Sequence, residues 1–564
     1  MSRLNLESEI NPASSGSTDS RSLAARLFGG LDTIDLILAT SFCAYAAIFI
    51  FKSSFKIGDI RYFSLFDDDM ISMRYAANFA HGYGLRWNPG GDKILGFTNP
   101  LWVLYMALFH LLPIAQAKLS LCIQISGAFF LLLNLFVVRA ICKELMPRTR
   151  SVAIVAMVLT AFYGPLNNWA LQGTEVSILT LLVSVSVWLA LLAVKSEARP
   201  MPIYLLLGIS TLIRLDMVVF SGVMLLAMAA MQPRRWRRHL LLGGVTLGAF
   251  LIAQAAFNRL YYGDLLPNTY YLKMTGFPLW LRIQRGVRVG ILFLVPWIPI
   301  MLVLSLSGFR TRLRRAWLLA AAIATQCAYS IWVGGDAWEW YGGSNRYISI
   351  VIPLVFILGA IGIESLAARL GDWSSASTGA WIRNLTIAMS AASFLFLVNL
   401  SHLRTNLLFS RPVQTDGNEE MVRQALLLRQ LTDDHATVAV VWAGAAPYFS
   451  GRQAIDLLGK SDLKIAHEPM HIDPTLMTRS FGFWPGHLKW DYDYSIGQLK
   501  PDVVLQLWAV SPNSISDLSR DYVPVKVDDF IWYVRRNSDH VLWTKFQDPN
   551  LASAMEFRRV LSSD

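Results

Sequence analysis

The chain is poor in charged residues and in cysteine, and each shortage excludes a class of protein. Charged residues make up 16% of its 564 positions, whereas soluble globular proteins average about 25%. The long polar C-terminal region has no cysteine, because all four lie in or beside apolar segments (Cys43, Cys122, Cys142 and Cys327). That region therefore holds neither a disulfide framework nor a cysteine-based zinc site. With 54% hydrophobic residues, the composition is typical of a protein that crosses a membrane several times.

The apolar runs predict eleven membrane spans. Nine cover residues 33–51, 119–141, 152–169, 176–194, 241–257, 289–306, 316–333, 348–366 and 385–400. Two more are short helices within 202–231, an apolar run that is interrupted by Arg214-Leu215-Asp216. We expect these charges at the tip of a helical hairpin. The apolar run 100–113 is too short for a span, which needs about 20 residues, so it predicts an interfacial or re-entrant helix.

The net charge of +11 helps to orient these spans. Fifteen basic residues fall in five short loops on one side, which the positive-inside rule assigns to the cytoplasm. The polar tail 1–32, predicted to be disordered, then also lies in the cytoplasm, and residues 402–564 lie outside. One outer loop opposes the rule, with Arg259, Lys273, Arg282, Arg285 and Arg288. Since so much of the positive charge is explained by topology, it gives no support to binding of nucleic acid.

Two modules follow from this division. Residues 33–401 form a mainly α-helical membrane module. Residues 402–564 are numerous enough for a core of their own, with buried strands expected at 438–442 and 503–508 and an amphipathic helix at 419–431. We expect this second module to be a small α/β domain that packs over the outer end of the bundle.

Five polar segments fall on the predicted outer side: residues 67–69, 167–175, 214–216, 261–276 and 334–346. Ionisable groups near membrane depth usually have a function, so their convergence predicts a catalytic or transport cavity. The sequence has no phosphate-binding GxxxxGK[ST] loop, no HExxH and no GxSxG. An enzyme at the outer face also lacks ready access to ATP or nucleotide sugars, so it must use an activated substrate linked to a lipid.

Asp67 and Asp68 are the leading catalytic candidates. Adjacent carboxylates suit removal of a proton from a hydroxyl, or binding of a divalent cation. The alternative is a solvated helix N-terminus, which we favour for Asp69. A spacing of seven residues places Arg74 on the helix face of Asp67, and Tyr75 on that of Asp68.

The segment YYGDLLPNTYYLK combines aromatic rings with Asn268, Tyr270 and Lys273. These side chains are either substrate-binding or an interfacial belt with a lysine that reaches the surface. Gly334-Gly335-Asp336, followed by aromatic residues and Arg346, offers a tight backbone and a cation that suits phosphate. Lys273 and Arg346 are therefore the candidates for binding a donor phosphate.

Two further pairs have an open role. Arg214 and Asp216 either neutralise each other or take part in the site. His487 and Lys489, in the string GHLK, either contact the acceptor or donor phosphate or belong to a surface loop.

Taken together, these strings resemble the GT-C glycosyltransferases, which use polyprenyl-phosphate sugars. They are most similar to the family of the terminal β-(1→2) arabinofuranosyltransferase of mycobacterial cell walls. The similarity extends from about residue 65 to 501 and rests on DDDMISMRYAANFAHGYGLRWNPG, ILGFTNPLW, LQGTEVSILTLL, LIRLDMVVF, YYGDLLPNTYYLK, VGGDAWEWYGGSNRY, AGAAPYFSGRQAIDLLGKSD and PGHLKW. In that family the acidic pair, here Asp67 and Asp68, is the catalytic site. Glu175 belongs to an element whose residue order differs here, and Arg214-Leu215-Asp216 replaces an Arg-Pro-Asp element.

The resemblance implies a multi-pass glycosyltransferase of the bacterial cytoplasmic membrane with an extracytoplasmic site. Its donor would be a decaprenyl- or undecaprenyl-phosphate sugar, with arabinofuranose the best single choice, and its acceptor a cell-envelope glycan, glycolipid or glycoprotein. No cofactor is implied beyond a possible divalent cation at Asp67 and Asp68. A carboxylate can act as base or nucleophile, so the stereochemical outcome stays open. Two alternatives remain: a transporter or flippase of lipid-linked saccharides, and a non-catalytic assembly subunit that binds glycans.

Overall fold

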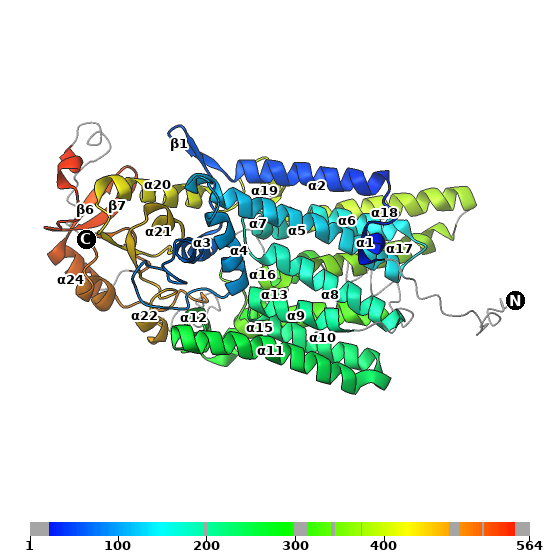
Figure 1. Ribbon diagram of the computed structural model, residues 1–564. Helices are drawn as coiled ribbons and strands as arrows, with labels where there is room; N and C mark the ends of the chain where they lie inside the picture. The colour runs from blue at the N-terminus through cyan, green and yellow to red at the C-terminus, as the bar shows by residue number, and fades with distance from the viewer. Residues whose placement is uncertain are drawn as a thin grey trace.

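The computed structural model describes residues 22–196, 200–297, 314–339, 345–373, 375–472, 484–509 and 512–547. A bundle of roughly parallel and antiparallel helices carries an α/β domain at one end (Figure 1). The short helix α1 (Leu23–Phe28) lies at the opposite end of the bundle (Figure 1). It occupies part of the tail expected to be disordered, a prediction that is wrong for residues 23–28; residues 1–21 lie outside the described ranges.

Six helices in the described ranges are long and apolar enough to cross a membrane. They are α2 (Thr33–Lys52), α5 (Gln116–Leu145), α8 (Val176–Ser196), α11 (Trp236–Tyr262), α17 (Ile352–Gly371) and α18 (Ala376–Val398). The chain is thus a multi-pass membrane protein, as its composition indicates. The number eleven stays a prediction, because several of the expected spans are shorter helices or extend outside the described residues.

The expected span 152–169 is broken into two helices. These are α6 (Arg150–Ala161) and α7 (Gly164–Leu171), and their axes are bent by 54°. Pro165 in the first turn of α7 lacks an N–H, and its ring prevents the preceding turn from continuing as a helix. The freed N–H of Gly164 donates to Oδ1 of Asn399 at 2.7 Å. The bend aims α7 and the loop after it toward the polar end of the bundle.

Shorter helices complete the bundle. The apolar run 202–231 forms α9 (Met201–Ile213) and α10 (Met217–Met231), separated at Arg214–Asp216 as the sequence predicts. The run 100–113 is the short helix α4 (Pro100–His110), also as expected. The others are α13 (Leu279–Leu294) and α15 (Trp317–Val333). Half of the expected span 289–306, residues 298–306, lies outside the described residues.

The end of the bundle nearest the α/β domain carries short elements that build the site. They are the antiparallel strands β1 (Phe55–Ile57) and β2 (Ile60–Tyr62), and the helices α3 (Asp67–Ala80), α12 (Asn268–Met274), α16 (Arg346–Ser349) and α19 (Leu403–Asn406). Because α3 begins at Asp67, all three aspartates lie in its first turn, where the helix dipole favours negative charge.

The C-terminal domain is a five-stranded mixed sheet in the order β4-β3-β5-β7-β6. Strand β3 (Thr437–Val440) is parallel to β4 (Gln453–Asp456) and to β5 (Val503–Val504), whereas β7 (Phe530–Arg535) is antiparallel to β5 and to β6 (Tyr522–Val527). Its helices are α20 (Thr415–Leu431), α21 (Ala445–Ser450), α22 (Leu463–His467) and α24 (Pro512–Asp521).

One apolar core joins this domain to the bundle. It includes Met70 and Tyr75 of α3, Trp102 of α4, and Val438 and Val440 of β3. Burial of a large apolar side chain stabilises a fold by about 1.5–3 kcal/mol, so this shared core holds the sheet rigidly against the acidic turn of α3.

Candidate active site

Asp67 accepts hydrogen bonds from the backbone of the C-terminal domain. The N–H of Ala445 donates to Oδ1 at 2.8 Å, and the N–H of Gly444 donates to Oδ2 at 3.3 Å. A Cβ at position 444 would overlap the carbonyl oxygen of Asp67, so this close approach requires glycine. The contact fixes the carboxylate with two neutral donors, which leaves lone pairs on both of its oxygens.

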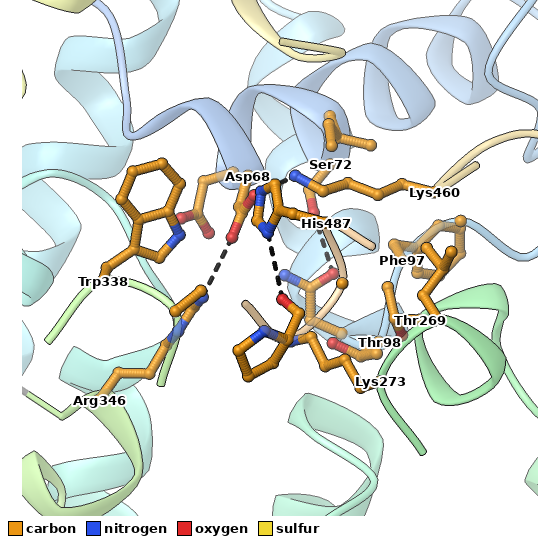
Figure 2. A pocket seen from close by; sticks show the side chains of 18 of the residues that line it. Asp68, Ser72, Phe97, Thr98, Thr269, Lys273, Trp338, Arg346, Lys460 and His487 are labelled. Atoms are coloured by element: carbon orange, nitrogen blue, oxygen red, sulfur yellow. Dashed lines mark hydrogen bonds and ion pairs between the residues drawn. The ribbon is translucent and has the colours of Figure 1, made fainter. Parts of the chain in front are cut away.

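Asp68 has a different environment, because it lies between two cations (Figure 2). Nζ of Lys460 is 2.8 Å from Oδ1, and a guanidinium nitrogen of Arg346 is 3.1 Å from Oδ2. Both cations come from elements far away in the sequence: Lys460 follows β4, and Arg346 begins α16.

Arg346 is itself held in place. Its Nε donates to Oδ2 of buried Asp336 at 2.9 Å, and its guanidinium lies 5.1 Å from the centre of the Trp169 ring. Asp336 thus orients the arginine instead of facing a substrate, while the arginine keeps one side toward Asp68.

These environments separate the pKa values of the three aspartates. Burial raises the pKa of Asp67 to about 6, although Lys460 opposes the shift. Burial would also raise the pKa of Asp68, but Lys460 and Arg346 hold it well below its usual range. Burial and the neighbouring Glu175 raise the pKa of Asp69 well above its usual range. Carboxyl groups whose pKa values are driven apart are typical of acid–base sites.

A cavity opens beside Asp68 (Figure 2). Its wall carries Asp69, Lys273, Arg346 and Lys460, and it is closed on one side by Trp338 and His487. No hydrogen bond or ion pair of Lys273 occurs within the described part of the chain, so its charge is available to a ligand.

His487 is buried in this wall and does not belong to a surface loop. Nδ1 lies 3.2 Å from the carbonyl oxygen of Pro485, which can only accept, so Nδ1 carries the proton. Burial and the nearby charge of Lys460 lower the pKa of His487 to about 3. The ring is therefore neutral, and Nε2 is a bare acceptor with no partner among the described residues.

A second cavity adjoins the first. Lys273, Arg346 and Glu175 line both cavities. Arg214 pairs with Asp216 at 2.7 Å and lies 3.5 Å from Glu175, so the hairpin tip is neutralised internally, as one of the two interpretations of the sequence has it. Tyr270 also lines this second cavity.

The structure does not bring four of the predicted binding residues to the first two cavities. Arg74 donates to the carbonyl oxygens of Trp87, Pro447 and Arg452, and Tyr75 donates to that of Ile94. The side chain of Asn268 donates to the carbonyl oxygen of Asp462 at 3.1 Å. Nζ of Lys489 donates to the carbonyl oxygens of Tyr271 and Ala466. Arg74, Asn268 and Lys489 thus hold the C-terminal domain against the bundle, whereas the bond of Tyr75 lies within the membrane module.

Sequence reasoning missed Lys460 and discounted Asp69. Lys460 lies in the string LLGKSD, but nothing in its spacing links it to an acidic turn 392 residues earlier. Asp69 is buried and lines the cavity, in contrast to the solvated position expected for it.

The residues around the acidic pair fit a divalent cation poorly. Among the described residues, no group of three or more His, Cys, Asp and Glu side chains is arranged to hold a metal ion. The two oxygens of Asp68 already face cationic side chains, and Asp67 accepts two backbone N–H groups. Lys460 and Arg346 thus supply the positive charge that a divalent metal ion would otherwise bring.

Comparison with known proteins places this geometry in a recognised fold. ArnT of Cupriavidus metallidurans, in a crystal structure bound to undecaprenyl phosphate, superposes with a TM-score of 0.55 at 14% identity, over 90% of this chain and 99% of ArnT. The apo oligosaccharyltransferase of Archaeoglobus fulgidus superposes with a TM-score of 0.52 at 11% identity, over 90% of this chain and 75% of that protein.

Sequence comparisons are less informative. Residues 411–546 match the model of a domain of unknown function, DUF8728. No curated protein matches the sequence at a significant level. At such low identities the structural likeness establishes the fold alone. The chain thus shares the fold of ArnT and of the archaeal oligosaccharyltransferase.

Proposed function

We propose that the chain is a membrane glycosyltransferase that moves a sugar from a polyprenyl-phosphate donor to an acceptor of the cell envelope. The observation that carries this proposal is that Asp67 and Asp68, adjacent in the first turn of α3, have different hydrogen-bond and ion-pair partners. Within the described part of the chain the hydrogen-bond donors to Asp67 are neutral, whereas Asp68 fixes two cations at the edge of a cavity that contains a third, Lys273.

The donor phosphate would bind between Lys273 and Arg346, which line both adjoining cavities. Bidentate guanidinium and point-charge ammonium groups are the usual protein ligands of phosphate. The second cavity is also lined by apolar side chains of α10 and α15 and of the segment before α12 (Val218, Val219, Leu266 and Val333). This apolar wall suits the first isoprene units of the lipid. ArnT, which shares the fold, binds undecaprenyl phosphate.

Asp67 would act as the general base. It takes the proton of an acceptor hydroxyl while that oxygen attacks the anomeric carbon, and the bond between this carbon and the phosphate oxygen breaks. The polyprenyl phosphate then leaves with its new charge facing Lys273 and Arg346. Such a single displacement inverts the configuration at the anomeric carbon.

The finer assignments belong to the same proposal. We assign residues 33–401 to a membrane module with eleven spans and 402–564 to an extracytoplasmic domain, in a bacterial cytoplasmic membrane with the N-terminus inside. The connections α5–α6, α10–α11 and α17–α18, where many basic residues lie, are at the end of the bundle opposite the α/β domain (Figure 1), which supports this orientation. Arabinofuranose is the preferred sugar because of the sequence resemblance.

The test offers purified protein a panel of synthetic polyprenyl-phosphate sugars and a glycan acceptor, and measures released polyprenyl phosphate. We expect turnover with at least one donor, and none with Asp67→Asn or Asp68→Asn. Asp59→Asn, an exposed aspartate between β1 and β2, is the matched control and should keep wild-type activity. Turnover that survives both substitutions at the acidic pair would refute the catalytic assignment.

A further inference from the structure

A third cavity lies on the other side of the acidic pair. It is bounded by Phe66 and Asp67, by the start of α20, and by residues after β3 and β5. Trp338 and His487 line both this cavity and the one beside Asp68, so they form the partition between the two. Asp67 therefore faces one cavity and Asp68 faces the other.

Four tryptophans form most of the apolar wall of this third cavity. The ring of Trp442 lies 5.7 Å from that of Trp338 and 6.2 Å from that of Trp508, and Trp484 lies 6.1 Å from Trp508. Trp442, Trp484 and Trp508 are only half-buried, so part of each ring faces the open space. The four come from separate parts of the chain and are brought together by the fold at this cavity.

Polar side chains of α20 and of the residue before it lie on the opposite wall. Gln414, Asn418 and Glu420 line the cavity, and none of their side chains makes a hydrogen bond within the described part of the chain. His487 adds Nε2, a buried acceptor with no partner among the described residues. An amide can both donate and accept, whereas a carboxylate and a neutral imidazole nitrogen accept from hydroxyl groups.

The charge of this cavity distinguishes its ligand from that of its neighbour. Among the described residues that line it there is no lysine or arginine, and Asp67 and Glu420 are acidic. The adjoining cavity, in contrast, carries Lys273, Arg346 and Lys460. A phosphate or another anion is therefore excluded from the third cavity by charge, and a neutral ligand with hydroxyl groups and flat apolar faces fits it.

We propose that this tryptophan-lined cavity binds a sugar ring of the acceptor, with a ring hydroxyl directed at Asp67. The C–H faces of the sugar stack on the indoles, and its other hydroxyl groups bind Asn418, Gln414 and His487 Nε2. The inference rests on the proposed function, since it makes the acceptor a saccharide and assigns it to the side of Asp67 away from the donor.

The test measures binding of saccharides without any donor. Full-length protein in nanodiscs is mixed with synthetic tetrasaccharides of arabinofuranose, galactofuranose or mannopyranose, and saturation-transfer NMR records transfer to the sugar protons. We expect at least one tetrasaccharide to bind, and its affinity to fall at least tenfold in Trp442→Ala and in Trp508→Ala. Trp490→Ala is the control, because Trp490 stacks on His471 outside this cavity and should bind within twofold of wild type.

Loss of a tryptophan can also unfold the domain, so each variant is compared with wild type by thermal unfolding. Asn418→Ala, which removes an amide without opening the apolar core, should weaken binding at least threefold without a lower midpoint. Failure of every tetrasaccharide to bind wild type, or wild-type affinity in both tryptophan variants, overturns the inference. Binding that depends on the tryptophans, in a protein that transfers no sugar, would support this site and refute the proposed transferase instead.

Discussion

Nζ of Lys460 lies 2.8 Å from Oδ1 of Asp68, although the two residues are 392 positions apart in the sequence. The exposed fractions of their side chains are 10% and 25%, so the pair is largely shielded from water. The lysine comes from the C-terminal domain and the aspartate from the membrane module. The site is therefore complete only when that domain is docked on the bundle.

Lys460→Ala should abolish most of the activity. A buried charge that loses its partner entirely costs about 3–5 kcal/mol; Asp68 would keep Arg346, so part of this cost applies, and the arrangement of the two cations around Asp68 is lost. We expect the turnover rate to fall by a factor of about 100 or more, measured as release of polyprenyl phosphate. Lys464→Ala is the matched control, because Lys464 forms a more exposed ion pair with Asp491 in the same domain. Equal activity of the two variants would contradict the role given to Lys460.

Lys273→Met should weaken donor binding without destabilising the fold. Its amine makes no hydrogen bond or ion pair within the described part of the chain and lines the donor cavity. A charge-assisted hydrogen bond contributes about 1.5–3 kcal/mol, so we expect the donor KM to rise by a factor of about 10 to 100 with an unchanged melting temperature. Lys489→Met should do the reverse, because Nζ of Lys489 holds two backbone carbonyl oxygens. A melting temperature that falls in Lys273→Met would argue against a free cation.

Arg346→Lys should be a poor replacement despite its conserved charge. The guanidinium bonds Asp336 through Nε while another of its nitrogens reaches Asp68, and an ammonium group cannot span both in this planar geometry. We expect kcat/KM for the donor to fall by about tenfold or more. Asp336→Asn should give a similar but smaller loss, because it frees the arginine without removing it. Wild-type kcat/KM in Arg346→Lys would mean that only charge matters at this position.

Single cysteines report the orientation of the bundle. In a variant without the four native cysteines, a cysteine in the 234–238 loop should react with a membrane-impermeant maleimide only after the cells are opened. A cysteine at exposed Asp59, in the β1–β2 turn at the end of the bundle that carries the α/β domain, should react in intact cells. The opposite pattern would invert the topology and place the acidic pair in the cytoplasm.

Much of the bundle could be predicted from the sequence, because hydrophobic length and the position of basic loops act locally. The hairpin of α9 and α10 and the short helix α4 were accessible from composition alone. The bend between α6 and α7 was not predicted, although Pro165 signals it, because the apolar run continues across the break.

The site was predictable only in part, because local patterns such as hydrophobic length do not show which distant residues meet in the fold. Segments 67–69, 214–216 and 334–346 could be grouped because topology assigns them to one side of a membrane. The ion pair of Lys460 with Asp68 could not be found in this way, since Lys460 lies outside any periodic pattern. Nor could a sequence separate Lys273 from Lys489, because the difference lies in which of the two finds hydrogen-bond partners in the folded chain.

The pH dependence of transfer should report the protonation of Asp67. Because burial raises its pKa to about 6, the carboxylate is mostly ionised at pH 7 and able to accept a proton. The catalytic rate should then be level above pH 7 and fall about tenfold for each pH unit well below 6.

Asp67→Asn should lower the catalytic rate by a factor of about 10² to 10⁴, the usual contribution of a general base. It should also remove the acidic limb of the pH profile, that is, the fall of the rate below pH 6. The control is Glu339→Gln, because burial raises the pKa of Glu339 to about 7 but this residue does not line the cavity beside Asp68. If the limb persists in Asp67→Asn and disappears in Glu339→Gln, then the proton that matters belongs to Glu339, and Asp67 has only a structural role through its hydrogen bonds to residues 444 and 445.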